Sequence, residues 1–558
     1  MPAHPEDTAC GRLSLTAIAA QALILALLTV AVYWPTLHAE FVYDARIQIL
    51  TDPFIHSAAN WGNVLSFRVL GMDVLDFNRP VHLIGLMIDT AIWGTNPIGY
   101  HLTSVLLHAA NTALLFFVLQ RLFVDGRATW PAIAAPFLCA LFFSIHPIMT
   151  EAVCEPTYRE DLLVTAFSLA AILLVLGHNN AAGGRDLIRA GLAASACFLA
   201  VGSKESGVAA PFFVLGCWLL LRRKDRPAFW IAAVAAGMFL VAAFTALRFY
   251  LETGSSVIFE HKPGYPGGSF TSAMELLPRI LVLYLQNLVW PTGLCADYGI
   301  VSVSHLNPAF CMVLLLLMAA AFGLVMWRSP RLSFAVLVVV LPILPVANLI
   351  PIYRPAADRY LYLPMAGAAL SLACFLCSEL LMARRACAIA ATSALAVVLL
   401  AFGWMNIDRQ MAWSSSIALW QDTVKKNPLS HTAAGGLGEA LRLDGRLQES
   451  EKYFRQAIRL SGGRIAENLM MDAVALEALG RRQEADNLLE LALDRDPRLA
   501  DPDSRVAALA ITHEEAAAIK ELLSRHPSGQ GGRIRLDFFT DKMPPLPVNT
   551  EAQWKSHR

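Results

Sequence analysis

Residues 187–221 read LIRAGLAASACFLAVGSKESGVAAPFFVLGCWLLL, which is two apolar runs joined only by Lys204 and Glu205. The runs, near 187–203 and 206–221, each approach the roughly 20 apolar residues that a membrane-crossing helix needs. Charged side chains at such a position are costly unless they pair or belong to a site. This stretch therefore predicts a helical membrane protein with ionisable residues at one end of its helices.

Similar apolar runs recur throughout residues 1–404. They lie near 14–34, 100–123, 131–149, 161–177, 187–203, 206–221, 229–250, 306–327, 333–350, 360–381 and 386–404. We therefore expect an all-α, polytopic membrane domain with about eleven spans over 1–404. The first run resembles a signal peptide, but its length and the lack of a clean small-x-small cleavage site favour an uncleaved anchor.

Composition agrees with this division. The chain of 558 residues is 56% hydrophobic and 16% charged, with a mean hydropathy of +0.51, which excludes a soluble cytosolic enzyme. Residues 405–558 carry 43 charged side chains, about 28%, whereas the first 404 carry 45, about 11%. A membrane domain is thus followed by a soluble tail. The 44 basic and 44 acidic residues balance, so nucleic-acid binding has no electrostatic basis.

Basic residues set the predicted orientation. They cluster at Arg121 and Arg127, Arg185 and Arg189, Arg222 to Arg226, Arg328 and Arg331, and Arg384 and Arg385. A cytoplasmic N-terminus with eleven spans places all five clusters inside the cell. This topology requires 276–290 to be interfacial or re-entrant and 80–93 to be a short helix at the outer surface. We expect a multi-pass protein of the cell (inner) membrane with a periplasmic tail.

The tail contains a repeat of about 35 residues. Gly445 and Gly480 are 35 residues apart, as are Arg446 and Arg481. This period is typical of tetratricopeptide (TPR) repeats, each a pair of helices, so we expect an α-solenoid over 405–526 that recruits a protein acceptor or partner. A simple spacer is the alternative. Residues 527–558 are predicted to be extended or disordered.

The predicted topology gathers paired acids and bases at the outer face. Asp44, in the first outer loop, could act as a general base, although alone it would be interpreted as a solvated loop acid. Outward-facing cations suit a lipid-linked phosphate, and we name Arg359, Lys204 and Arg159 for this role. An ion-pair network that fixes helix ends is the alternative. The supporting site residues are Arg79, His146, Glu151, Asp161, Glu205 and Asp358.

Other polar residues receive structural interpretations. His101, His108 and Asn111 share one helix face and favour helix–helix hydrogen bonds over metal ligation. A Cys154–Cys295 disulfide is allowed, since both are predicted outside. Nucleotide-binding loops, zinc-hydrolase motifs and nucleophile elbows are absent from the sequence, and no metal-ligand cluster stands out.

An ordered series of short motifs resembles a known family. The series is FVYD (41–44), NRP (78–80), GYHL (99–102), LLHAAN (106–111), HPIMTEAV (146–153), YREDLL (158–163), SKES (203–206), DYG (297–299) and DRYLYLP (358–364). Together with the repeats it resembles the transmembrane-and-TPR (TMTC-like) protein O-mannosyltransferases, of the GT-C glycosyltransferase superfamily, and their bacterial relatives.

The resemblance implies a GT-C-like membrane domain that uses a polyprenyl-phosphate sugar, with Asp44 as the catalytic base. It also implies donor-phosphate roles for Lys204 and Arg359, which match family positions. The family usually has two adjacent acids where this chain has Asp44-Ala45, and it has Glu where this chain has Asp358.

Sequence and resemblance together predict a membrane glycosyltransferase that moves a sugar, with mannose the first choice, to an extracytoplasmic acceptor, for which we expect a protein hydroxyl. It needs no cofactor because the donor, a lipid-linked co-substrate, is already activated, and a divalent metal is unsupported. One alternative is a non-catalytic scaffold whose repeats bind envelope proteins, which the missing second acid favours. Another is a transporter or flippase for a lipid-linked sugar.

Overall fold

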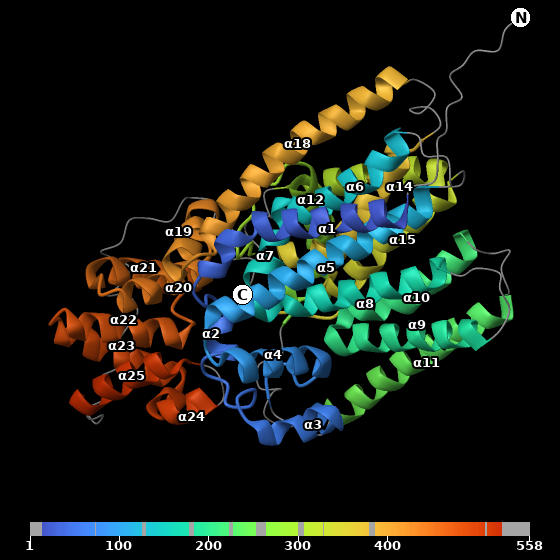
Figure 1. Ribbon diagram of the computed structural model, residues 1–558. Coiled ribbons are helices and arrows are strands. Elements are labelled where there is room, and N and C mark those ends of the chain that lie inside the picture. The colour runs from blue at the N-terminus through green and yellow to red at the C-terminus, as the bar shows by residue number, and fades with distance from the viewer. Residues whose placement is uncertain are drawn as a thin grey trace, which may run out of the picture.

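The computed structural model describes residues 14–526 except 73, 125–129, 178–183, 222–226, 253–263, 300–305, 327–328, 379–384 and 508–510. The predicted tail segment 527–558 lies outside these residues. The secondary structure of the described part is helical throughout, without strands, as the sequence predicts. Figure 1 shows a bundle of long helices, with a group of shorter C-terminal helices beside one end of it.

The bundle is built by helices from the first 412 residues. The longer ones are α1 (Leu15–Val32), α5 (Pro97–Phe123), α6 (Trp130–Ile145), α8 (Arg159–Leu176), α9 (Gly184–Ser203), α11 (Pro227–Glu252), α12 (Phe270–Val289), α14 (Pro308–Met326), α15 (Pro330–Val340), α16 (Tyr362–Leu376) and α18 (Arg385–Ala412). The α10 helix (Ala210–Gly216) continues into a π-helical turn at Cys217–Leu221.

Four helices of the described part are long and apolar enough to cross a membrane: Leu15–Val32, Pro97–Phe123, Asp358–Leu376 and Ala386–Ala412. A fifth span arises if Ala134–Ile145 and Pro147–Cys154, bent by 48° at Pro147, count as one. These segments coincide with predicted runs, and the chain is a multi-pass membrane protein. Six further apolar helices are shorter, so the number eleven, the orientation and the interfacial placement of 276–290 stay predictions.

Polar side chains connect the helices inside the bundle. His108 shares a hydrogen bond of 2.7 Å with the Tyr362 hydroxyl, and its Nε2 lies 2.9 Å from the Ser144 carbonyl oxygen. Asn111 donates to the Leu162 carbonyl oxygen over 2.9 Å. These contacts confirm the predicted helix–helix hydrogen bonding for His108 and Asn111, whereas His101 is buried against the Phe41 ring.

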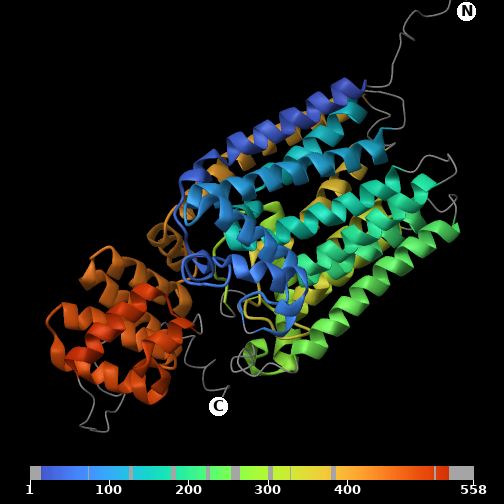
Figure 2. The ribbon, with the colours of Figure 1, turned by 60° about the horizontal axis from the view of Figure 1, so that its bottom comes forward.

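The long connections at one end of the bundle fold over it (Figure 2). The first connection contains α2 (Asp44–Gln48), α3 (Trp61–Leu65) and α4 (Pro80–Trp93), and α4 has the bounds predicted for the short helix at 80–93. Its apolar residues form a separate core that includes Phe41, Ala45 and Ile49. This core fixes α2, and with it Asp44, above the helices.

The allowed Cys154–Cys295 disulfide is not formed, and both residues are free buried thiols. The Cys154 thiol lies 3.2 Å from the Thr36 hydroxyl, and the Cys295 thiol donates to the Asp297 carbonyl oxygen over 3.5 Å. Each thiol is thus directed to a different polar partner in its own surroundings.

Paired helices form the C-terminal region. They are α19 (Ser416–Lys426), α20 (His431–Leu443), α21 (Leu447–Ser461), α22 (Ala466–Ala478), α23 (Arg482–Arg495), α24 (Pro502–Ala507) and α25 (His513–Arg525). Gly445 and Gly480 end α20 and α22 with φ of +79° and +75°, a region that glycine enters without a steric cost. The 35-residue spacing therefore corresponds to a repeated turn between paired helices, and the TPR assignment itself stays a prediction.

Candidate active site

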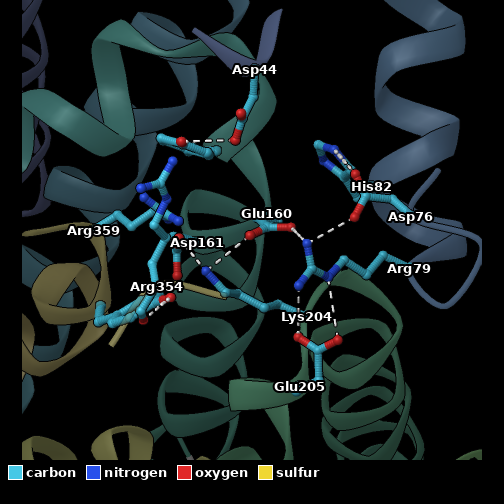
Figure 3. A network of polar contacts seen from close by, with 12 residues as sticks. Asp44, Asp76, Arg79, His82, Glu160, Asp161, Lys204, Glu205, Arg354 and Arg359 are labelled. Atoms are coloured by element: carbon cyan, nitrogen blue, oxygen red, sulfur yellow. Dashed lines mark hydrogen bonds and ion pairs between the residues drawn. The ribbon is translucent and has the colours of Figure 1, made fainter. Parts of the chain in front are cut away.

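A cavity of about 1040 Å³ opens where the long connections at one end of the bundle meet the ends of α8, α9 and α11. Its ionisable lining residues are Asp44, Asp76, Arg79, Glu160, Lys204, Glu205, Arg354 and Arg359. They come from segments more than 300 positions apart in the chain, and Figure 3 shows their side chains directed toward a shared space. Tyrosines, uncharged polar residues and apolar residues complete the walls.

Asp44 is the first residue of α2 and lies partly exposed on the cavity wall. Its Oδ2 accepts a hydrogen bond of 2.9 Å from the Tyr158 hydroxyl. The preceding residue, Tyr43, has φ of +53° and ψ of −126°, a conformation that costs a non-glycine residue free energy and that occurs often at functional sites. The cavity thus contains a carboxylate held at the start of a helix by an unusual backbone turn.

Lys204 and Arg79 share the carboxylate of Glu160. The Lys204 ammonium lies 2.9 Å from Glu160 and also pairs with Asp161, and Arg79 pairs with Glu160 as well. The Arg79 guanidinium also lies 2.9 Å from Asp76 and 3.0 Å from Glu205. Burial lowers the pKa of Lys204, but Asp161 and Glu160 outweigh burial and raise it overall. Lys204 therefore carries its charge inside the protein.

The other two cations lie against tyrosine rings. The Arg359 guanidinium lies 4.0 Å from the centre of the Tyr158 ring and pairs with Glu151, which also accepts the Arg359 backbone N–H over 3.1 Å. Arg354 lies 5.4 Å from the Tyr43 ring centre and 2.7 Å from the Asp297 carboxylate. Both guanidinium groups are oriented from two sides, which favours a fixed anion site.

Asp76 is a cavity-lining acid whose pKa is raised toward neutral pH. Burial raises its pKa to about 6, against the opposing effect of Arg79, while Glu160 and Glu205 add to the rise. His82, 3.9 Å away, has its pKa lowered to about 3 by burial and is neutral at pH 7. Mild acid therefore removes a negative charge beside Arg79.

The structure brings five of the predicted site residues to the cavity surface: Asp44, Arg79, Lys204, Glu205 and Arg359. Glu151 and Asp161 lie behind that surface, where they hold Arg359 and Lys204. The prediction thus named residues that converge, although most of them are too far apart in the sequence for spacing to show it.

Three predicted site residues do not line the cavity. Arg159 pairs with Asp89 at 2.6 Å and donates to the Tyr100 carbonyl oxygen, on another side of α8. His146 lies 3.0 Å from the Leu288 carbonyl oxygen and packs on Phe402, and Asp358 accepts a hydrogen bond from Tyr298. The structure therefore places Arg159 away from the cations proposed to bind phosphate, and the Arg159 guanidinium serves to fix α8 against α4 and α5.

Sequence reasoning missed four lining residues: Asp76, Tyr158, Glu160 and Arg354. Tyr158 and Glu160 belong to the quoted motif YREDLL, in which only Arg159 and Asp161 were predicted to be site residues. Arg354 is a lone arginine in the loop before α16, and only its contacts with Tyr43 and Asp297 distinguish it. Among the described residues no group of three or more His, Cys, Asp or Glu side chains is arranged to hold a metal ion.

Fold and site together define a helical membrane protein with a charged cavity above its bundle. No family model matches the chain. Among curated proteins it is 24% identical over 455 residues to protein O-mannosyl-transferase F38B6.6 of Caenorhabditis elegans, covering 78% of this chain and 62% of that protein. It is 22% identical over 537 residues to protein O-mannosyl-transferase TMTC3 of Homo sapiens, covering 88% and 56%.

A shorter match reaches 34% identity over 170 residues of protein O-mannosyl-transferase TMTC2 of Mus musculus, covering 29% of this chain and 19% of that one. The chain is therefore similar to the TMTC-type protein O-mannosyl-transferases, as its motifs predict, and spans less than two thirds of the length of these relatives. A crystal structure of ArnT from Cupriavidus metallidurans bound to undecaprenyl phosphate aligns with a TM-score of 0.40 at 13% identity, over 92% of this chain and 89% of that one.

Proposed function

We propose that this protein is a membrane glycosyltransferase that moves a sugar, mannose being the first candidate, from a polyprenyl phosphate to a hydroxyl of an extracytoplasmic protein. The observation that carries the proposal is the meeting of the partly exposed Asp44 carboxylate, held by the Tyr158 hydroxyl, with four cations in a single cavity. The names of the relatives, all protein O-mannosyl-transferases, support the reaction class.

In the proposed reaction the Asp44 carboxylate removes the proton of the acceptor hydroxyl while the oxygen of that hydroxyl attacks the anomeric carbon of the sugar. The bond between that carbon and the phosphate oxygen breaks, and its electron pair stays on the phosphate. The Tyr158 hydrogen bond orients Asp44 in this step. The products are the glycosylated acceptor and a polyprenyl phosphate, and no nucleotide or redox partner is needed.

The cations stabilise the phosphate as its negative charge grows. Arg359 and Arg354 offer fork-shaped donors whose positions are fixed by Tyr158 and Tyr43, respectively. Lys204 and Arg79 contribute further positive charge, and Glu160 holds both. Because these groups are already oriented before the ligand arrives, they stabilise the leaving group without a reorganisation cost.

An apolar pocket suits the lipid part of the donor. Its volume is about 300 Å³, and it is lined by apolar residues of α12, α14, α15 and α16. The short helix Leu341–Val346 contributes Pro345 to the charged cavity and Leu344 to the apolar pocket. Likewise, Tyr360 lines the charged cavity and Leu361 lines the apolar pocket. A polyprenyl phosphate with its headgroup in the cavity therefore has an apolar site for its chain next to it.

The test is a transfer assay with purified full-length protein in nanodiscs, a polyprenyl-phosphate mannose donor and a panel of Ser/Thr-containing peptides. We expect transfer by the wild type and its loss in Asp44→Asn. Glu40→Gln is the matched control, since Glu40 is an exposed acid of the same loop outside the cavity lining. Transfer that survives Asp44→Asn disproves the assigned base. A wild type that is inert with every polyprenyl-phosphate sugar and peptide favours the scaffold alternative.

A further inference from the structure

The first two helices of the C-terminal region contact residues that support the walls of the cavity. Trp420 of α19 lies edge-on to Tyr43, with 5.1 Å between the ring centres. Tyr43 is the residue before Asp44, and its ring centre also lies 5.4 Å from the Arg354 guanidinium of the cavity wall. Trp420 is only 7% exposed, so this contact is a packed interface.

The contact with Trp420 bears on the backbone turn that presents Asp44. A tyrosine with φ of +53° keeps this conformation only where the surroundings hold it. The Tyr43 ring is held between Trp420 and Arg354, and no covalent or glycine-based feature of the turn enforces its shape. The orientation of Asp44 at the start of α2 therefore depends on a residue of the C-terminal region.

A second contact reaches Arg354 through Asp297. The Ser430 hydroxyl donates a hydrogen bond to Oδ2 of Asp297, and Oδ1 of the same carboxylate lies 2.7 Å from the Arg354 guanidinium. Ser430 is also the N-cap of α20, because its Oγ accepts the Ala433 backbone N–H over 2.9 Å. One buried hydroxyl thus caps a helix of the C-terminal region and fixes the acid that orients Arg354.

Neighbouring hydrogen bonds make this contact rigid. Asn427 donates to the carbonyl oxygens of Asp297 and Tyr298 over 2.8 and 2.9 Å, and Lys426 donates to that of Leu294 over 2.8 Å. The segment between α19 and α20 therefore holds the 294–298 loop by its backbone. A displacement of α20 would carry Asp297 with it and release Arg354.

We propose that Trp420 and Ser430 are positioning residues of the sugar-transfer site: Trp420 acts through Tyr43 on Asp44, and Ser430 acts through Asp297 on Arg354. The inference rests on the proposed function, since it assigns Asp44 to proton removal and Arg354 to the donor phosphate. It gives the α19–α20 pair a role in catalysis as well as any role in recruiting a partner.

The test compares Ser430→Ala with Ser415→Ala in the full-length protein. Both variants remove an N-cap, because the Ser415 Oγ accepts the Ala418 backbone N–H over 3.2 Å in α19, but only Ser430 contacts Asp297. We expect Ser430→Ala to raise the KM for polyprenyl-phosphate mannose about tenfold, equivalent to the loss of one charge-assisted hydrogen bond, with a smaller effect on kcat. Ser415→Ala should leave both constants unchanged, and Ser430→Thr should restore the wild-type KM.

Trp420 provides the complementary result. Trp420→Leu should lower kcat more than it raises KM, because it disturbs the backbone turn before Asp44, whereas Arg354 keeps its ion pair with Asp297. Trp420→Phe should recover most of the rate. If both residues had a purely structural role, their variants would give less folded protein. The Ser430 variant would then not act mainly on KM while the Trp420 variant acts mainly on kcat. Equal KM values for Ser430→Ala and Ser415→Ala would overturn the proposal.

Hydrogen exchange separates failure of this inference from failure of the proposed function. Peptides covering 40–48 should exchange faster in Trp420→Leu, and those covering 350–357 faster in Ser430→Ala, whether or not the protein transfers mannose. If exchange is faster in the variants but the wild type transfers no sugar, the coupling of Trp420 and Ser430 to the cavity stands and the proposed transferase function is rejected. Unchanged exchange in both variants, with the wild type active, would reject the coupling alone.

Discussion

The Tyr158 hydroxyl donates to Oδ2 of Asp44 over 2.9 Å while the face of its ring lies 4.0 Å from the Arg359 guanidinium. One side chain therefore orients both the proposed base and a proposed phosphate ligand. The two functions belong to different atoms of the tyrosine, which allows them to be separated by substitution.

Tyr158→Phe removes the hydroxyl and keeps the ring. We expect kcat to fall on the order of tenfold, because Asp44 loses one oriented hydrogen bond, while the KM for donor stays near the wild-type value because Arg359 keeps its stacking partner. Steady-state transfer kinetics check this result. An unchanged kcat with a raised KM would reverse the assignment of hydroxyl and ring.

Ala45→Asp recreates the adjacent acids usual in related proteins. Ala45 is fully buried in the apolar core with Phe41 and Ile49, so its side chain faces away from the cavity. We expect no gain in transfer and a lower thermal midpoint, since a buried acid without a partner costs roughly 2 kcal/mol or more. Ala45→Ser serves as a milder control. Faster transfer at an unchanged Tm would show that this fold does accept a second acid facing the site.

Asp76 makes donor binding depend on pH. Burial raises its pKa to about 6, so a fall in pH from 7 to 5 neutralises Asp76 and removes a carboxylate that competes for Arg79. The donor is a phosphodiester with constant charge in this range, and its affinity should therefore increase as the pH falls. Asp76→Asn should bind tightly at pH 7 and show a weaker dependence on pH. Donor titrations at pH 5, 6 and 7 measure it, and weaker wild-type binding in acid would contradict the argument.

Ala368→Phe fills part of the apolar pocket. Ala368 is half-buried among Leu281, Leu344 and other pocket residues. We expect a higher KM for long-chain polyprenyl-phosphate mannose and an unchanged KM for a short-chain analogue that does not reach the pocket. Competition between the two donors in one assay gives the ratio of their kcat/KM values directly. Equal effects on both donors would place the lipid chain elsewhere.

The parts of the structure that depend on local pattern could be predicted. The helix at 80–93 follows from its apolar run after Pro80, and the repeated turns follow from Gly445 and Gly480. The convergence of Asp44, Lys204 and Arg359 followed from assigning every apolar run a direction across the membrane. Such reasoning identifies which end of the bundle carries a side chain.

The apolar pattern of the sequence could not identify which side of a helix a side chain occupies. Arg159 and Glu160 are neighbours at the start of α8, yet Glu160 faces the cavity and Arg159 faces Asp89, because successive helical residues point about 100° apart. The missed Arg354 depends on a different cause. Its orientation comes from Tyr43 and Asp297, both distant in the sequence, and no local pattern records that contact.

The most direct test of the central claim is a single-turnover measurement on Asp44→Asn loaded with polyprenyl-phosphate mannose. Because the four cations are unchanged, the variant should bind the donor with wild-type affinity. Because the base is gone, the transfer rate should fall about 10²- to 10⁴-fold. Wild-type transfer rates in the donor-loaded variant, or loss of donor binding in a correctly folded variant, would contradict the assignment of Asp44 as the base beside a separate phosphate site.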